Sequence, residues 1–150
     1  MKTIHLSGDH AGFKLKEKLK KFLEKKGFTV KDFGPREYNE NDDYPDFVIP
    51  MARAMIKKKN TVGIIIAGSG EGEAIAVNKI KGIRAALYHG GNPKIVKTTR
   101  EHNDSNILSL GSRFVKENEA KKAIDIFLKT KFTGGRHRRR LGKYRKLGSK

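Results

Sequence analysis

Two glutamates stand in a glycine-rich loop that follows an apolar run. The stretch "IIIAGSGEGEAIAVNK", residues 64–79, predicts a buried strand, a glycine loop and then a helix. Loops of this layout usually bind phosphate through backbone N–H groups at the helix N-terminus. Glu71 and Glu73 would repel a phosphate, so the stretch indicates another use for a carboxylate. The loop also lacks the third glycine of a dinucleotide-binding motif and the Gly-Lys-Ser/Thr ending of a P-loop.

Further residues able to do chemistry stand next to the other strands that the sequence predicts. They are Asp9 and His10 after the first strand, Tyr44 after the second, Arg113 after the fifth, and His102 and Asn103 just before the fifth. Acids, histidines, a tyrosine and an arginine at strand ends are the groups that an active site requires. We therefore expect them to collect at one edge of a sheet.

Each of these residues also has a simpler structural interpretation. Asp9 can cap the first helix, and His102 can be a solvated loop histidine. Tyr44 before a proline can be a packing residue, and Arg113 can pair with any nearby acid. Because these residues stand together at strand ends, the active-site interpretation is favoured over the separate structural interpretations.

Short β-branched runs alternate with helical stretches along the chain. Strands are predicted at residues 3–6, 28–33, 61–68, 83–89 and 106–111. Helices are predicted before Gly27 and at about 46–59, 73–80, 92–102 and 118–129. Strands that are each followed by a helix indicate an α/β fold with a five-stranded parallel sheet covered on both faces. Ligands bind such sheets at the carboxyl ends of the strands.

The length and composition limit the classes of protein to consider. The 150 residues predict a single domain, with a basic C-terminal tail at about 131–150. The absence of cysteine excludes a disulfide framework, a thiolate metal site and a cysteine nucleophile. No segment approaches the roughly 20 apolar residues of a membrane span, so we expect a soluble, cytoplasmic protein.

The net charge of +18 raises the alternative of nucleic-acid binding. The tail at 131–150 holds nine Lys and Arg residues and no acid, which accounts for half of this excess. Much of the rest consists of lysines in stretches with helical periodicity. Beyond Arg140 the tail can be a frayed helix, a dimer-packing arm or a nonspecific polyanion contact. Charge is the only support for nucleic-acid binding, and we do not expect it to be the function.

Six ordered stretches resemble the ribose-5-phosphate isomerase B family, which also contains allose-6-phosphate and galactose-6-phosphate isomerases. They are "GDHAGFKLK", "DYPDF", "AGSGEGEAIAVNK", "GIRAAL", "REHNDSNILSLGSR" and "GGRHRRR". The resemblance implies a Rossmann-like three-layer α/β/α sandwich and a homodimer, or dimer of dimers, with active sites shared between subunits. It also implies interconversion of ribose 5-phosphate and ribulose 5-phosphate through an enediolate, a step of the pentose phosphate pathway.

The resemblance identifies Glu73 as the base that moves the proton. Many members of the family carry a cysteine base immediately before the glycine loop, where this chain has Ala67. Another branch, familiar from actinobacteria, lacks that cysteine and uses a glutamate at the position of Glu73. The helix N-terminus should lower the pKa of this carboxyl group and burial should raise it, and the sequence leaves open which effect is larger.

The other candidate residues are expected to perform three tasks in the reaction. The Ser69 hydroxyl and the N–H groups from Gly70 to Gly72 would face the enediolate oxygens, where a helix N-terminus favours negative charge. The family points to His102 as the acid or base of ring opening, with Asp9 as helper and with Asn103 and Tyr44 positioning the sugar. The phosphate would be met by His10, Arg113, Arg136 and Arg140. Glu71 is expected to be a solvated loop residue.

The reaction needs no redox cofactor, and the family needs no metal; the histidines show no close metal-ligand spacing. Two alternatives to a ribose-5-phosphate isomerase stay open. One is an isomerase of a related sugar phosphate such as allose 6-phosphate. The other is a non-catalytic sugar-phosphate or polyanion-binding protein on the same fold.

Overall fold

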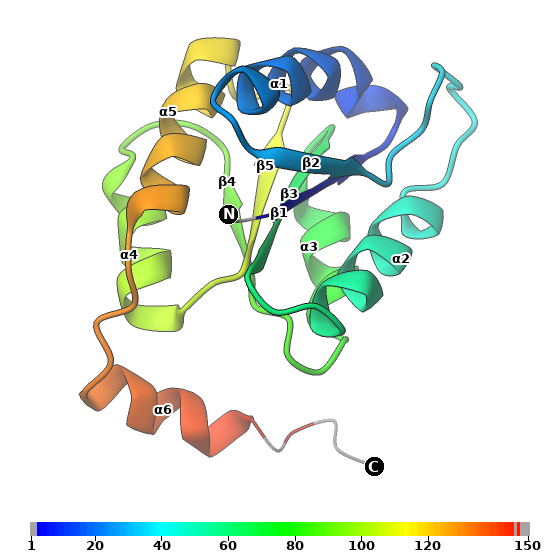
Figure 1. Cartoon of the computed structure of the whole chain (residues 1–150). Coiled ribbons are helices and arrows are strands. Elements are labelled where there is room, and N and C mark those ends of the chain that lie inside the picture. Colours follow the sequence, from blue (N-terminus) through cyan, green and yellow to red (C-terminus); the bar gives the residue numbers. More distant parts are fainter. Residues whose placement is uncertain (1–2, 146, 148–150) are drawn as a thin grey trace.

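A five-stranded parallel sheet forms the centre of the molecule (Figure 1). The computed structural model describes residues 3–145 and 147. The strands run in the order β2-β1-β3-β5-β4. Their bounds are Thr3–Gly8 (β1), Thr29–Asp32 (β2), Thr61–Ala67 (β3), Ala85–Tyr88 (β4) and Ile107–Gly111 (β5). The predicted α/β class and parallel sheet are confirmed.

Helices cover both faces of the sheet and make a three-layer α/β/α sandwich. They are η1 (His10–Gly12, a 3₁₀ turn), α1 (Phe13–Lys25), α2 (Pro45–Ile56), α3 (Glu71–Asn78), α4 (Lys94–Asn103), α5 (Glu117–Lys129) and α6 (Arg136–Tyr144). One apolar core lies between the sheet and α1, α4 and α5, and a second lies between the sheet and α2 and α3.

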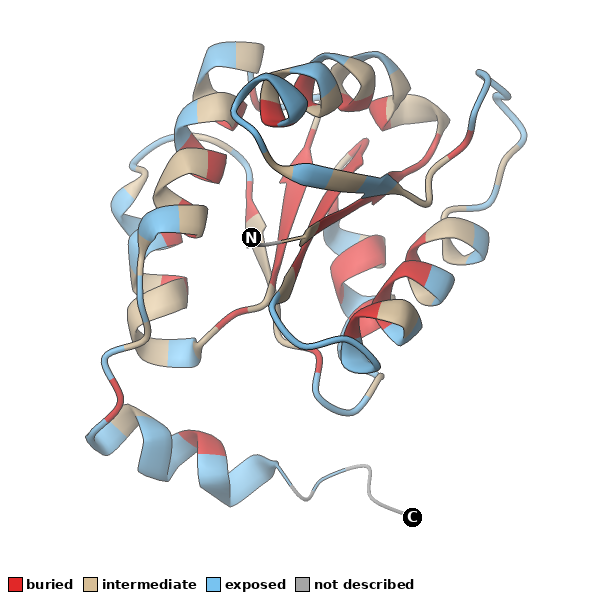
Figure 2. Ribbon diagram, in the orientation of Figure 1, coloured by how far each residue is buried: buried red, intermediate tan, exposed pale blue. Residues whose placement is uncertain are grey.

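Alternation along the central strand explains the two cores. Ile64 and Ile66 belong to the core under α1, α4 and α5, whereas Ile65 belongs to the core under α2 and α3. Successive side chains of a strand point to opposite faces, so an unbroken apolar run fits a strand buried on both sides. Figure 2 shows the central strands as buried and most of α6 as exposed.

The order of the strands places the switch point of the sheet between β1 and β3. After β1 the chain continues outward to β2, and after β3 it continues to the other half of the sheet, with β4 and β5. The helices that follow these two strands, α1 and α3, therefore lie on opposite faces. Such a switch in strand order opens the binding crevice of parallel sheets at the carboxyl ends of the strands.

The basic segment forms a helix that the sequence did not assign. Helix α6 contacts α4 and keeps one buried apolar residue, Leu141. In the view of Figure 1, β3 and β5 run upward and α6 lies below their amino ends. The tail residues 146 and 148–150 lie outside the described part of the chain.

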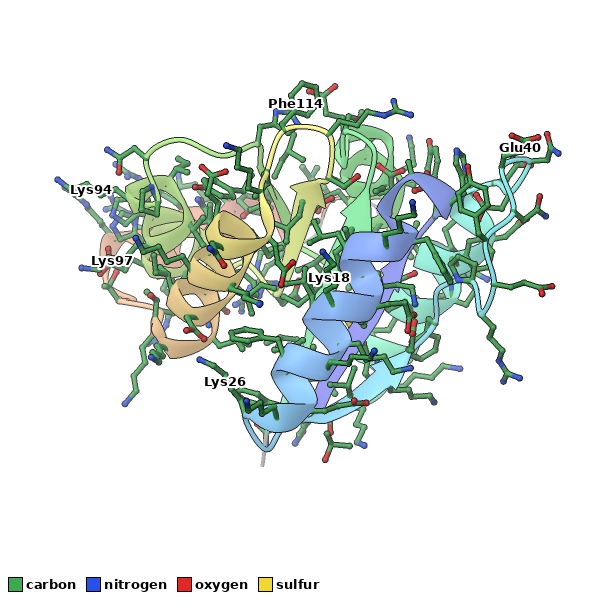
Figure 3. All side chains as sticks on the ribbon, turned by 90° about the horizontal axis from the view of Figure 1, so that it is seen from above. Lys18, Lys26, Glu40, Lys94, Lys97 and Phe114 are labelled. Atoms are coloured by element: carbon green, nitrogen blue, oxygen red, sulfur yellow. The ribbon has the colours of Figure 1, made fainter. Side chains whose placement is uncertain are left out.

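Several lysines on or next to the outer helices face solvent, and some of them are paired with acids. Figure 3 shows Lys18 on α1, Lys26 just after the end of α1, and Lys94 and Lys97 on α4. Lys18 pairs with Glu117 at 3.0 Å, and Lys26 pairs with Asp125 at 2.6 Å. These lysines therefore belong to solvated helix faces. In the part of the chain that the structure describes, no helix has the length and apolarity of a membrane span.

Candidate active site

The loops that follow β1, β3 and β5 are tied together at the carboxyl edge of the sheet. The Ser112 hydroxyl donates to the carbonyl of Ala11 at 2.9 Å, and its N–H donates to the carbonyl of Ala67 at 2.7 Å. The guanidinium group of Arg113 lies over Gly68, since a Cβ there would be 3.1 Å from its Cζ atom. Arg113 thus belongs to the same crevice as the glycine loop.

Tyr44 reaches the glycine loop from the segment before α2. A Cβ added to Gly72 would lie 2.7 Å from the phenol oxygen of Tyr44, so the ring rests on the loop backbone. Close approach of the two groups requires a glycine here. The predicted sugar-positioning tyrosine therefore lies at the mouth of the same crevice.

The glycine loop presents free donors at the start of α3. Gly70 has a left-handed backbone, φ 77°, and its carbonyl accepts a hydrogen bond from the Ser109 hydroxyl at 2.7 Å. The Ser69 hydroxyl oxygen accepts from the N–H of Glu71 at 3.3 Å, so its own proton remains available. Within the described residues, the N–H groups of Gly70 and Gly72 make no protein hydrogen bond. Such a set of donors suits an anion.

Glu73 is the third residue of α3, and its side chain is turned into the protein. The residue is only 4% exposed. Burial raises the pKa of its carboxyl group, the charge of Asp9 raises it further, and a hydrogen bond from its own backbone N–H lowers it. The net direction is upward. The competition that the sequence left open is thus decided by burial, which makes Glu73 a stronger base than an exposed glutamate.

Asp9 caps η1, as its simpler interpretation predicts, because its carboxylate accepts a hydrogen bond from the Gly12 N–H at 3.2 Å. It is also buried and close enough to Glu73 to influence that group. Capping and a role in the site are therefore compatible.

His10 has a partner that sequence reasoning missed. Its ring Nδ1 lies 2.6 Å from Oδ1 of Asp42, in the loop that also carries Tyr44. The acidic run "NDDYP" was the available signal, but it does not say which acid turns inward. Side-chain atoms of Asp9, His10 and Asp42 lie within 4.8 Å of one another, a spacing able to hold a metal ion. Two of these three residues, His10 and Asp42, are already engaged with each other by a hydrogen bond.

The remaining predicted site residues lie at the opposite edge of the sheet. His102 and Asn103 end α4, and the carbonyl of Asn103 accepts from Arg84, which immediately precedes β4. The His102 ring stacks on that of His137 in α6, with centroids 4.1 Å apart. Arg136 and Arg140 belong to the same helix.

The expectation that His102 and Asn103 join the others at one edge is therefore wrong within a single chain. Residues that directly precede a strand lie at its amino end, and in a parallel sheet every amino end faces the same way. One chain therefore presents two groups of predicted site residues, separated by the length of the strands.

A cavity of about 780 Å³ lies at this amino edge, between the start of β4 and the end of α6. It is lined in part by Ile80, Ile83, Ala86, Asn103 and Tyr144. Apolar residues are exposed beside it and on α3: Ile75, Tyr144 and Leu147.

Comparisons with known proteins agree with this architecture. Residues 4–144 match the sequence model of the Ribose/Galactose Isomerase family. The probable ribose-5-phosphate isomerase B of Mycoplasma pneumoniae is 44% identical, over 93% of this chain and 91% of the relative. The ribose-5-phosphate isomerase B of Mycolicibacterium paratuberculosis is 37% identical, over 92% and 86% of the two chains.

Solved structures are equally similar. Ribose-5-phosphate isomerase B of Clostridium thermocellum superposes with a TM-score of 0.91 at 43% identity, over 97% of this chain and 96% of that one. The Mycoplasma genitalium enzyme with bound ribulose-5-phosphate gives 0.90 at 41% identity, over 96% and 94%. With its sheet order, its crevice and this similarity over nearly the whole length, the chain belongs to the ribose/galactose isomerase family.

Proposed function

We propose that the chain is a ribose-5-phosphate isomerase of the B type, with Glu73 as the base that shuttles the proton. The observation that carries the proposal is the placement of Glu73: a buried carboxyl group of raised pKa, at a helix N-terminus, beside free backbone donors. Relatives named as ribose-5-phosphate isomerase B support the choice of substrate, including one with bound ribulose-5-phosphate.

The chemistry follows from these groups. Glu73 takes the proton from C2 of the open-chain aldose, which leaves an enediolate with negative charge on its oxygens. The same carboxyl group then returns the proton to C1, and a second proton passes from the C2 hydroxyl to the C1 oxygen, which gives the ketose. The N–H groups of Gly70 and Gly72 and the Ser69 hydroxyl stabilise the charge while it exists. Burial of Glu73 keeps water from competing for the proton.

The complete site is assembled from two copies of the chain. His102, for ring opening, and Asn103, for sugar positioning, lie at the edge opposite Glu73, as do the phosphate-binding Arg136 and Arg140. A pentose phosphate is too short to reach both edges of one sheet, so a second copy must bring these residues to the crevice of the first. The exposed apolar residues Ile75, Tyr144 and Leu147 support such an interface. A homodimer satisfies this requirement, and a dimer of dimers does so equally.

The test is isomerisation of ribose 5-phosphate by the purified chain and by two matched variants. Glu73→Gln removes the base and should lower kcat by about 10²–10⁴-fold. Glu71→Gln is the control, because this carboxylate stands two positions earlier in the same loop but is exposed. Wild-type turnover in Glu73→Gln would refute the assignment of the base.

The choice of sugar is tested separately by comparing kcat/KM for ribose 5-phosphate and allose 6-phosphate. A higher kcat/KM for allose 6-phosphate would identify the hexose phosphate, and not the pentose phosphate, as the preferred substrate. Absence of turnover on both, with retained binding of sugar phosphate, would favour the non-catalytic alternative. The cytoplasmic location and the single-domain organisation stay predictions.

A further inference from the structure

One oxygen of Asp42 holds His10 at two points. Oδ1 accepts a hydrogen bond from the backbone N–H of His10 at 3.1 Å and lies 2.6 Å from the ring Nδ1. The two residues are 32 positions apart, and the Asp42 side chain is only 5% exposed. The contact therefore fixes both the main chain and the ring of His10 with a carboxylate that is nearly shielded from water.

The second oxygen of this carboxylate has no hydrogen-bond partner among the described residues, and it is buried. A buried carboxylate with a free oxygen is unfavourable unless a positive charge lies beside it. The His10 ring is the group in hydrogen-bond contact, so the protein gains from a protonated imidazole at this place.

The geometry also determines what the other ring nitrogen can do. Because Nδ1 donates to Asp42, Nε2 is the nitrogen left without a protein hydrogen bond in the described part of the chain. In the neutral ring, Nε2 carries a lone pair and repels phosphate oxygens. In the protonated ring, Nε2–H donates, and the hydrogen bond to phosphate is charge-assisted.

We propose that Asp42 is a positioning residue that keeps His10 doubly protonated and thereby makes it a donor to the phosphate of the sugar substrate. The inference rests on the proposed function, together with the expectation from the family resemblance that His10 meets the phosphate. Asp42 does not touch the substrate in this role; it acts through the orientation and charge of the ring.

Charged groups from three elements act on His10. The hydrogen bond from Asp42 raises its pKa most, and the charges of Asp9 and Asp42 raise it further. Partial burial and the charge of Arg113, in the loop after β5, lower it. The net pKa is raised, so the ring stays protonated to a higher pH than an isolated histidine. The ring of Tyr38, whose centroid is 6.2 Å away, contacts it edge-on and adds no charge.

The experiment compares Asp42→Asn with Asp43→Asn. Asparagine at position 42 still offers an oxygen to both His10 donors but removes the charge. Asp43 is the matched control, since it is the adjacent acid and is exposed. For Asp42→Asn we expect KM for ribose 5-phosphate at pH 8 to rise about five- to tenfold with kcat little changed. The rise of KM with pH should begin at a lower pH than in the wild type and in Asp43→Asn.

A double variant separates this role from a structural one. In a His10→Gln background, Asp42→Asn should raise KM no further, because both changes remove the same interaction. An equal additional rise there, or an unchanged profile of KM against pH in Asp42→Asn, would overturn the proposal.

NMR titration of the His10 ring tests the same point without turnover. The pKa of His10 should be lower in Asp42→Asn than in the wild type and in Asp43→Asn, and an equal pKa would refute the pairing. If the wild type does not isomerise ribose 5-phosphate, the proposed function fails on that result. The titration, run with and without inorganic phosphate, then still decides whether Asp42 controls the charge of His10.

Discussion

Asp9 and Glu73 are both buried in the crevice, and the charge of Asp9 raises the pKa of Glu73. The proposed base, Glu73, must be deprotonated to act, so activity should fall at low pH as this carboxylate takes up a proton. In Asp9→Asn the pKa of Glu73 should fall, and the acid limb of kcat/KM should move to lower pH. Asparagine retains an oxygen for the Gly12 N–H, which preserves the cap. A limb that stays in place or moves to higher pH in the measured profile would contradict this prediction.

Active sites shared between subunits predict that two inactive variants restore each other. In a mixed dimer of Glu73→Gln and His102→Asn chains, one site carries both substitutions and the other carries neither. Random mixing of equal amounts should therefore return about a quarter of the wild-type activity. The measurement is turnover after joint refolding or coexpression. Activity no greater than the mean of the two parent variants would show that each site is built from one chain.

Lys16 and Lys20 both pair with Asp32 but should contribute very differently to stability. The Lys16 side chain is fully buried and lies 2.6 Å from Asp32, whereas that of Lys20 is 32% exposed and lies 3.3 Å away. Lys16→Met should lower the free energy of unfolding by about 3 kcal/mol, because it leaves the largely buried charge of Asp32 with less compensation. Lys20→Met should change it by about 0–1 kcal/mol. Urea unfolding at one protein concentration compares the two, and equal effects would be the contrary result.

The buried His5 predicts a loss of stability at acid pH. Burial lowers the pKa of His5 most, and the charges of Lys31 and Lys58 lower it further, against a hydrogen bond from its ring to the backbone carbonyl of Met51 that raises it. The unfolded chain therefore binds a proton near the ordinary value of 6.5, and the folded chain binds it only at lower pH. The stability contributed by neutral His5 is present above this value and is lost as pH falls below it.

His5→Leu removes this titration. The decrease in unfolding free energy between pH 7.5 and pH 5.5 should be smaller in the variant than in the wild type. Urea denaturation at both pH values gives the comparison. The same decrease in both proteins would mean that His5 is not the group responsible.

Local patterns predicted the fold because the strands are buried on both faces and the helices are amphipathic. The unbroken run Ile64–Ile66 marked the central strand, and it occupies that place. The ends of helices and strands were predicted less accurately. Helix α3 begins at Glu71 instead of Glu73, since the left-handed Gly70 already turns the chain into the helix. The 3₁₀ turn His10–Gly12 was not foreseen, because it depends on the Asp9 cap.

Local sequence patterns could not predict the contacts between distant loops. The pairing of His10 with Asp42 joins residues 32 positions apart, and "NDDYP" alone cannot say which acid is buried. Lys16 looked like one more solvated lysine of an amphipathic helix, although its side chain is fully buried. The position of His102 was within reach of the sequence, because a residue placed just before a parallel strand belongs to the amino edge.

Ala67 ends β3 as a buried methyl group at the position where the family resemblance implies a cysteine base in many members, and the chain has no cysteine at all. A thiolate base is lost once peroxide oxidises it or an alkylating agent caps it. A carboxylate base is open to neither reaction. Turnover should therefore persist in peroxide or iodoacetamide at concentrations that inactivate a cysteine-dependent isomerase.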